Sequence, residues 1–226
     1  MTGIPGIADL DTWQLIALAG ALGWASGLRL YAVLFVVGGL QWLGWVELPP
    51  GLHVLAHPWV LGASGLMLGT EFFADKVPGL DSIWDVVHTF IRIPAGAALA
   101  AGVFGDAPAA GTLAAAILGG SLAAGAHFTK TGARAMINTS PEPFSNWSAS
   151  LGEDLAVGTV LWLAFTHPLA AGVVLLLLIV LMAWLIPKLW RFIAGIVRRI
   201  GGAGRRDDSV TSQDLRSPSR LPPPRV

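Results

Sequence analysis

The sequence predicts an all-α fold: a polytopic membrane helical bundle with about six to seven membrane segments, broken or re-entrant helices and a weak internal repeat. Of its 226 residues, 54% are hydrophobic and 12% are charged, and the mean hydropathy is +0.66. Several apolar tracts reach or approach the roughly 20 residues that a helix needs to cross a bilayer. The 28 glycines and ten tryptophans also fit membrane helices, where small residues allow close packing and Trp anchors the interface.

The first apolar tract, 13–45, is too long for one straight membrane helix. Its length of about 50 Å at 1.5 Å per residue exceeds the roughly 30 Å of a hydrocarbon core. The stretch WASGLRLY interrupts the tract near its middle. We therefore expect two shorter helices or one re-entrant pair, hinged near Ser26 and Gly27.

Five more apolar segments follow, separated by polar or proline-containing links. They are 54–75, 84–104, 109–136, 148–166 and 169–186. Residues 1–187 are thus expected to form the membrane domain. After Pro187, the stretch KLWRFIAGIVRRI predicts a basic amphipathic surface helix over 188–200, and the Gly, Arg, Ser and Pro-rich segment 201–226 predicts a disordered cytoplasmic tail.

The basic residues predict the orientation. Nine of the fourteen Lys and Arg lie in 188–226, so the positive-inside rule places the C-terminus in the cytoplasm. Counting segments back from there places the links 76–83 and 138–147 on the same side. LGASGLMLGTEFFADK also resembles LGGSLAAGAHFTKTGAR, which indicates a repeat of two hairpins that point the same way. A re-entrant 148–166 would reverse this assignment.

Charged side chains within the apolar body recur three or four residues apart, which places them on shared helix faces. These stripes are Glu71 with Asp75; Asp81, Asp85, His88 and Arg92; and His127, Lys130, Arg134 and Asn138. Arg29 lies at the break in the first tract. Charges in a membrane usually face protein or water and have partners, so we expect the basic stripe to pack against the acidic ones around a polar centre. The alternative is a set of ion pairs that only holds the bundle together.

Two ligand classes fit such a centre. A cation would be bound by carboxylate oxygens of Glu71, Asp75, Asp81, Asp85, Glu153 and Asp154, with a ring nitrogen of His88 or His127 as a further ligand. A phosphate or carboxylate would instead be bound by Lys76, Arg92, Lys130 and Arg134, with Asn138 and Ser140 donating hydrogen bonds. Acids outnumber bases here, which favours a divalent cation or proton coupling. The chain has no cysteine, which excludes disulfides, thiolate metal sites and thiol catalysis.

Four segments resemble the hallmark segments of the integral membrane family catalogued as domain of unknown function 4126. They are ASGLRLY, EFFADKVPGLDSIWDVVHTFIR, HFTKTGARAMINTSPEPFSN and SLGED. The resemblance covers about residues 10–187 and leaves out the tail. It implies a bacterial multi-pass protein, which would lie in the inner (plasma) membrane, and it implies no activity. The site residues therefore rest on side-chain chemistry alone.

The leading functional hypothesis is a transporter or channel for a small ion or polar solute, because broken helices and a polar centre are what a solute path needs. One alternative is a membrane enzyme or carrier acting on a lipid-linked phosphate substrate, with Asp81 and Asp85 holding Mg²⁺. An enzyme is less favoured, because the sequence contains no Walker loop, HExxH or G-x-S-x-G motif. Another is a structural or accessory protein. Membrane lipid is the expected partner, a homo-oligomer stays open, and no nucleic acid is expected.

Overall fold

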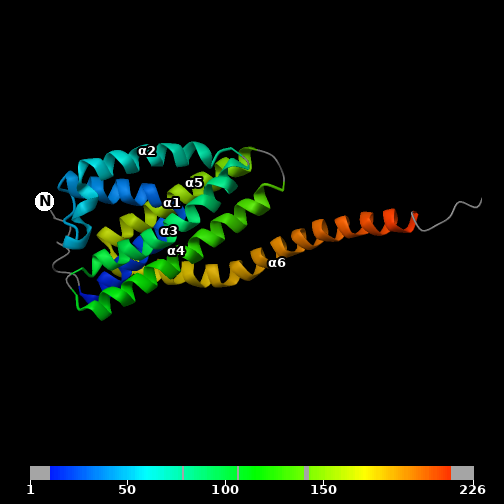
Figure 1. The fold of residues 1–226 in the computed structure, drawn as a ribbon. Coiled ribbons are helices and arrows are strands. Elements are labelled where there is room, and N and C mark those ends of the chain that lie inside the picture. The colour runs from blue at the N-terminus through cyan, green and yellow to red at the C-terminus, as the bar shows by residue number, and fades with distance from the viewer. Residues whose placement is uncertain (1–10, 78, 106, 140–142, 215–226) are drawn as a thin grey trace, which may run out of the picture. The chain divides into compact units, whose positions relative to one another are not determined.

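The computed structural model describes residues 11–77, 79–105, 107–139 and 143–214, and every regular element within these ranges is a helix (Figure 1). In order these are α1 (Thr12–Trp42), the 3₁₀ helix η2 (Pro50–Ala56), α2 (Pro58–Ala74), α3 (Leu80–Val103), α4 (Ala109–Ile137), α5 (Pro143–Thr166) and α6 (Pro168–Asp214). The predicted all-α class is confirmed. The contacts divide the chain into one unit over Met1–Leu189 and a second over Trp190–Val226.

Four of these helices are long and apolar enough to cross a membrane: α1, α3, α4 and the part of α6 over Pro168–Ile196. A fifth span results if η2 and α2, bent by 67° at their junction, are counted together. This count is close to the predicted six or seven segments. The count is lower because the two halves of 13–45 belong to the single element α1. In addition, α5 is not counted as a span, since it carries Glu153 and Asp154 among small polar residues.

The first half of α1 runs alongside α4, in the same direction. A Cβ added at Gly23 would lie 2.6 Å from the Cα of Gly119, and one added at Gly27 would overlap the backbone of Ala123. The side-by-side glycines let the two backbones approach closely, as small residues do in membrane helix pairs. At Arg29 the backbone leaves the helical region, with φ −140° and ψ 67°.

Beyond Arg29 the second half of α1 runs back along α2. Phe35 packs against Gly65 of α2, and Gly38 lies against Leu55 of η2. Both ends of α1 therefore lie at the same end of the first unit (Figure 1), and the break at Arg29 is the tip of a hairpin inside it. Of the two predicted arrangements for 13–45, the structure has the re-entrant pair, with its hinge at Arg29 and not at Ser26 or Gly27.

The remaining helices of this unit alternate in direction. α4 and α6 run parallel, since Gly125 lies beside Met182 and Gly132 beside Leu189. The α2–α3 and α4–α5 connections lie at one end, here called the link end and defined by Ala74, Leu80 and Ile137. The tip of the α1 hairpin points toward that end.

α6 differs from the predicted C-terminal organisation. Pro187 lies inside the helix and does not end it, so the predicted surface helix 188–200 is part of α6. Residues 201–214, predicted as part of a disordered tail, are helical as well. Residues 215–226 lie outside the described ranges.

Candidate functional site

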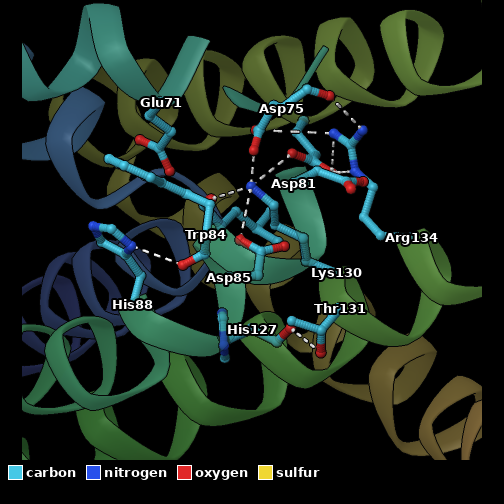
Figure 2. A network of polar contacts seen from close by, with 12 residues as sticks. Glu71, Asp75, Asp81, Trp84, Asp85, His88, His127, Lys130, Thr131 and Arg134 are labelled. Carbon is cyan, nitrogen blue, oxygen red and sulfur yellow. Dashed lines mark hydrogen bonds and ion pairs between the residues drawn. The ribbon is translucent and has the colours of Figure 1, made fainter. Parts of the chain in front are cut away.

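Five helices bring charged side chains together inside the first unit, on the link-end side (Figure 2). This charged network consists of Arg29, Glu71, Asp75, Asp85, Arg92, Lys130, Arg134, Glu153 and Asp154. Glu153 is 14% exposed and Asp154 is 35% exposed, whereas the other seven side chains are buried. All nine belong to the predicted site, so the expected polar centre exists, with Arg29 supplied by the α1 break.

Lys130 lies at the centre of the network. Its Nζ is 2.9 Å from Asp75 Oδ2, 3.3 Å from Glu153 Oε2 and 3.6 Å from Asp85 Oδ1. It also donates at 3.3 Å to the carbonyl oxygen of Leu28, just before the break in α1. Figure 2 shows the ammonium group between the carboxylates of Asp75 and Asp85.

Arg29 joins the hairpin tip to α2 and α5. Its guanidinium lies 2.6 Å from Asp75 Oδ2 and 2.9 Å from Asp154 Oδ1. It also donates to Ser150, to the hydroxyl at 2.6 Å and to the carbonyl at 3.2 Å. Asp75 follows the last residue of α2. The ammonium of Lys130 and the guanidinium of Arg29 both compensate its carboxylate.

Arg134 connects α4 to the link-end part of α5. It contacts Glu153 Oε1 at 3.1 Å and donates at 3.1 Å both to the side-chain oxygen of Asn146 and to the backbone oxygen of Asp75. Asn146 in turn donates to Asn138 Oδ1 at 2.8 Å. This chain of hydrogen bonds ties the network to a second, smaller polar cluster.

That second cluster surrounds Asp81 in the first turn of α3. Its carboxylate accepts from the backbone N–H groups of Gly79 and Ser82, at 2.9 and 2.7 Å, and from Asn138 at 3.0 Å. Neutral donors at a helix N-terminus stabilise a carboxylate without a cation. Asp81 and Asn138, both predicted site residues, therefore bind each other and link the first turn of α3 to the end of α4.

Arg92 and Glu71 form the most enclosed pair. Arg92 donates to Glu71 Oε1, and its other terminal nitrogen lies 2.7 Å from Asp85 Oδ1. All three side chains have no exposed surface. The second oxygens of Glu71 and Asp85 are buried without a hydrogen-bond partner.

The hydrogen bonds of His127 identify its tautomer. Thr89 donates its single hydroxyl proton to the Asp85 carbonyl, so its oxygen accepts from His127 Nε2 at 2.7 Å. Nδ1 lies 3.3 Å from an Arg92 nitrogen, and a guanidinium can only donate. His127 is therefore neutral, with its proton on Nε2.

His88 forms two hydrogen bonds, one of which links α3 to α1. Its Nδ1 lies 2.8 Å from the Trp84 carbonyl, which can only accept, and its Nε2 lies 3.0 Å from the Tyr31 hydroxyl. The ring also stacks on Trp84, with centroids 4.1 Å apart. His88 thus links α1 to α3 beside the network and makes no ion pair in the described part of the chain.

Among the predicted Lys and Arg residues of the site, Lys76 is the one that the structure keeps out of the network. Its Nζ donates to the Phe72 carbonyl at 3.2 Å and lies 3.0 Å above the Phe72 ring. Ser140, a predicted hydrogen-bond donor, lies outside the described residues. Asn146 and Ser150 were missed, although they precede Glu153 and Asp154 at helical spacing on α5 and this signal could have identified them.

An apolar groove connects the network to the outside of the unit. A cavity of about 840 Å³ lies between α1, α2 and α5, lined by Val36, Leu68, Phe72, Val157 and Phe165 among others, with Asp154 as its charged residue. A smaller cavity shares Phe72 and Asp154 and is also lined by Lys76. Among the described residues, no group of three or more His, Asp and Glu is placed to hold a metal ion.

Comparisons with known proteins agree with the predicted resemblance. The model of a family described as domain of unknown function (DUF4126) matches residues 16–188. No curated protein and no solved structure matches the chain. The matched range contains all nine residues of the charged network and both halves of the α1 hairpin. The chain belongs to the DUF4126 family.

Proposed function

We propose that the chain is a membrane transport protein that moves a small ion or polar solute through the charged network. The observation that carries this proposal is the tip of the α1 hairpin, which brings Arg29 and a helix break to buried ion pairs. Broken helices that meet charged side chains inside a membrane are typical of transport sites, because backbone groups released from the helix can bind an ion or a polar group.

The break exposes the polar ends of two half-helices. The first half ends at Leu28, whose carbonyl accepts from Lys130, and the second half starts beyond Arg29. The C-terminal end of a helix carries partial negative charge and the N-terminal end partial positive charge. A break at this position therefore places opposite dipole ends beside the same cluster of charges, which a purely packing role does not need.

The network also has an approach from outside the unit. Asp154 is part of the network through Arg29 and lines both the large groove and the smaller cavity. A small movement of α5 would separate Asp154 from Arg29 and open the interior, while Lys130 keeps its contacts with Asp75 and Asp85. This arrangement favours a gated path for a solute and not a sealed cluster with a purely structural role.

A carrier for a lipid-linked phosphate is the second candidate. The groove is largely apolar. Lys76, which makes no ion pair with a carboxylate among the described residues, lines the smaller cavity that shares Phe72 and Asp154 with the groove. An acyl chain in the groove would bring a phosphate to that ammonium group. Binding of a phosphorylated lipid that Lys76→Gln abolishes would support this candidate, and equal binding by both proteins would contradict it.

The orientation is also a proposal. The positive-inside rule applied to 188–226 places the link end on the cytoplasmic side of a bacterial inner membrane. Single cysteines at Val77 and Thr139, in a chain without native cysteine, should then react with an impermeant maleimide only from the cytoplasmic side. Reaction of either one only from outside would contradict this orientation.

Transport itself is tested with the purified protein in liposomes. Concentration jumps of H⁺, Na⁺, K⁺, chloride and phosphate on a supported membrane should produce a transient current with at least one of them. Lys130→Gln should abolish that current, because it removes the central cation. Lys188→Gln, an exposed lysine of α6 outside the network, is the matched control and should keep it. Absence of current with every ion, or a full current in Lys130→Gln, would contradict the proposal.

A further inference from the structure

We propose that the network binds a proton on Glu71 and that this proton is the coupling ion of the transport cycle. The protonation follows from charge and contacts alone. The coupling role rests on the proposed transport function. The proton would sit on Oε2, since Oε1 accepts from Arg92 and Oε2 is buried without a partner.

The charges of the network do not balance. It contains four cations, Arg29, Arg92, Lys130 and Arg134, and five carboxyl groups, on Glu71, Asp75, Asp85, Glu153 and Asp154. Of the two nearby histidines, His127 adds no charge, because its hydrogen bonds require the neutral ring, and His88 makes no ion pair in the described part of the chain. An uncompensated charge buried in a low-dielectric interior is costly, and a carboxyl group in that position takes up a proton instead.

The contacts distinguish the five carboxyl groups. Asp75 and Glu153 each lie within 4 Å of three cations, and Asp85 lies that close to two. Asp154 contacts one cation but is 35% exposed, so water solvates its charge. Glu71 contacts a single cation and has no exposed surface. It is therefore the carboxyl group that gains least from ionisation.

The surroundings of Glu71 agree with this choice. Arg92 of α3 is the cation in contact, and Lys130 of α4 and Arg29 of α1 act on it from further away, as does the carboxylate of Asp75. The Tyr31 hydroxyl of α1 also interacts electrostatically with the Glu71 carboxyl group, and it is hydrogen-bonded to His88. Arg92 is shared with Asp85, so the cation nearest to Glu71 compensates two acids.

A proton on Glu71 gives the cycle a neutral state and a charged state. When the proton leaves Oε2, one net negative charge appears beside Arg92, next to the hairpin tip. A cation or a polar solute entering the network would then be attracted, and reprotonation would release it. The exchange needs only a proton and the solute, and it changes no covalent bond other than O–H.

Infrared difference spectroscopy of the purified protein tests the protonation directly. A protonated carboxyl group has a carbonyl-stretch band that a carboxylate lacks. At neutral pH the wild type should show this band, Glu71→Gln should lose it, and Glu71→Asp should keep it at a shifted frequency. Asp81→Asn, which removes a buried acid that lies outside the network, is the matched control and should retain the band.

The two parts of the proposal can fail separately. A band that is absent from the wild type, or that persists in Glu71→Gln, overturns the protonation of Glu71 whatever the protein transports. A proton flux into liposomes, measured with an enclosed pH dye, should be lost in Glu71→Gln. If the band behaves as expected but the wild type moves no protons while still moving another ion, the coupling role is wrong and the transport proposal stands.

Discussion

At the scale of single residues, Lys130 is the side chain on which most of the network depends. It compensates Asp75, Asp85 and Glu153, and no other cation of the described chain contacts all three. Asp75 keeps Arg29 and Asp85 keeps Arg92 when Lys130 is removed. The loss is therefore partly compensated, and the excess of carboxyl groups over cations rises from one to two.

This arithmetic predicts the stability of a mutant cycle. Lys130→Gln should lower the free energy of unfolding by about 3–5 kcal/mol, which is typical when one partner of a buried ion pair is removed. Adding Asp85→Asn returns the excess of carboxyl groups over cations to one and should restore part of that loss. Unfolding by SDS titration measures both values. A double variant no more stable than Lys130→Gln alone would show that the two residues are not coupled.

The residue types and their spacing predicted which residues form this network better than they predicted which of these residues contact one another. The stripes on α3 and α4 placed Asp85, Arg92, Lys130 and Arg134 on shared faces, and the structure brings these faces together. Spacing within one helix carries no information on contacts between helices, so it could not separate Lys76, which turns onto Phe72, from Lys130. Neutral members such as Ser150 carry no charge signal and were missed.

At the scale of elements, the hairpin of α1 is the feature on which the site depends. Its tip reaches the network because glycines let its first half lie against the backbone of α4. The sequence indicated a break, since 33 apolar residues exceed the bilayer, but the Gly and Ser that suggested its position remain helical. The break falls at Arg29 because the guanidinium binds Asp75, Asp154 and Ser150 there.

Gly27 tests this packing. A Cβ there would overlap the Ala123 backbone, which cannot move aside like a side chain. Gly27→Ala should therefore destabilise the protein by about 1–3 kcal/mol, as overpacking does. Gly62→Ala is the matched control: nothing lies within 4 Å of its added Cβ, and the change should be neutral or stabilising by about 0.5–1 kcal/mol. Equal thermal midpoints for the two variants would contradict the close α1–α4 contact.

At the scale of the whole first unit, two helical hairpins, α2–α3 and α4–α5, connect at the same end, and the α1 hairpin enters from the other. The count of segments was predicted approximately, because apolar length marks membrane helices well. The return of α1 was one of two predicted alternatives. Contacts with α4 and α2 decide between two separate helices and a re-entrant pair. The apolar composition of 13–45 cannot decide, because it is the same for both arrangements.

The central claim is that the charged network is a transport site and not only a structural cluster. The most direct test is the transport current of Asp85→Asn combined with Lys130→Gln, measured in liposomes with the ion that gives a current in the wild type. The double variant keeps the excess of carboxyl groups over cations at one, so we expect a folded protein of partly restored stability with no current. A folded double variant with the full wild-type current would contradict the claim and leave these residues as architecture.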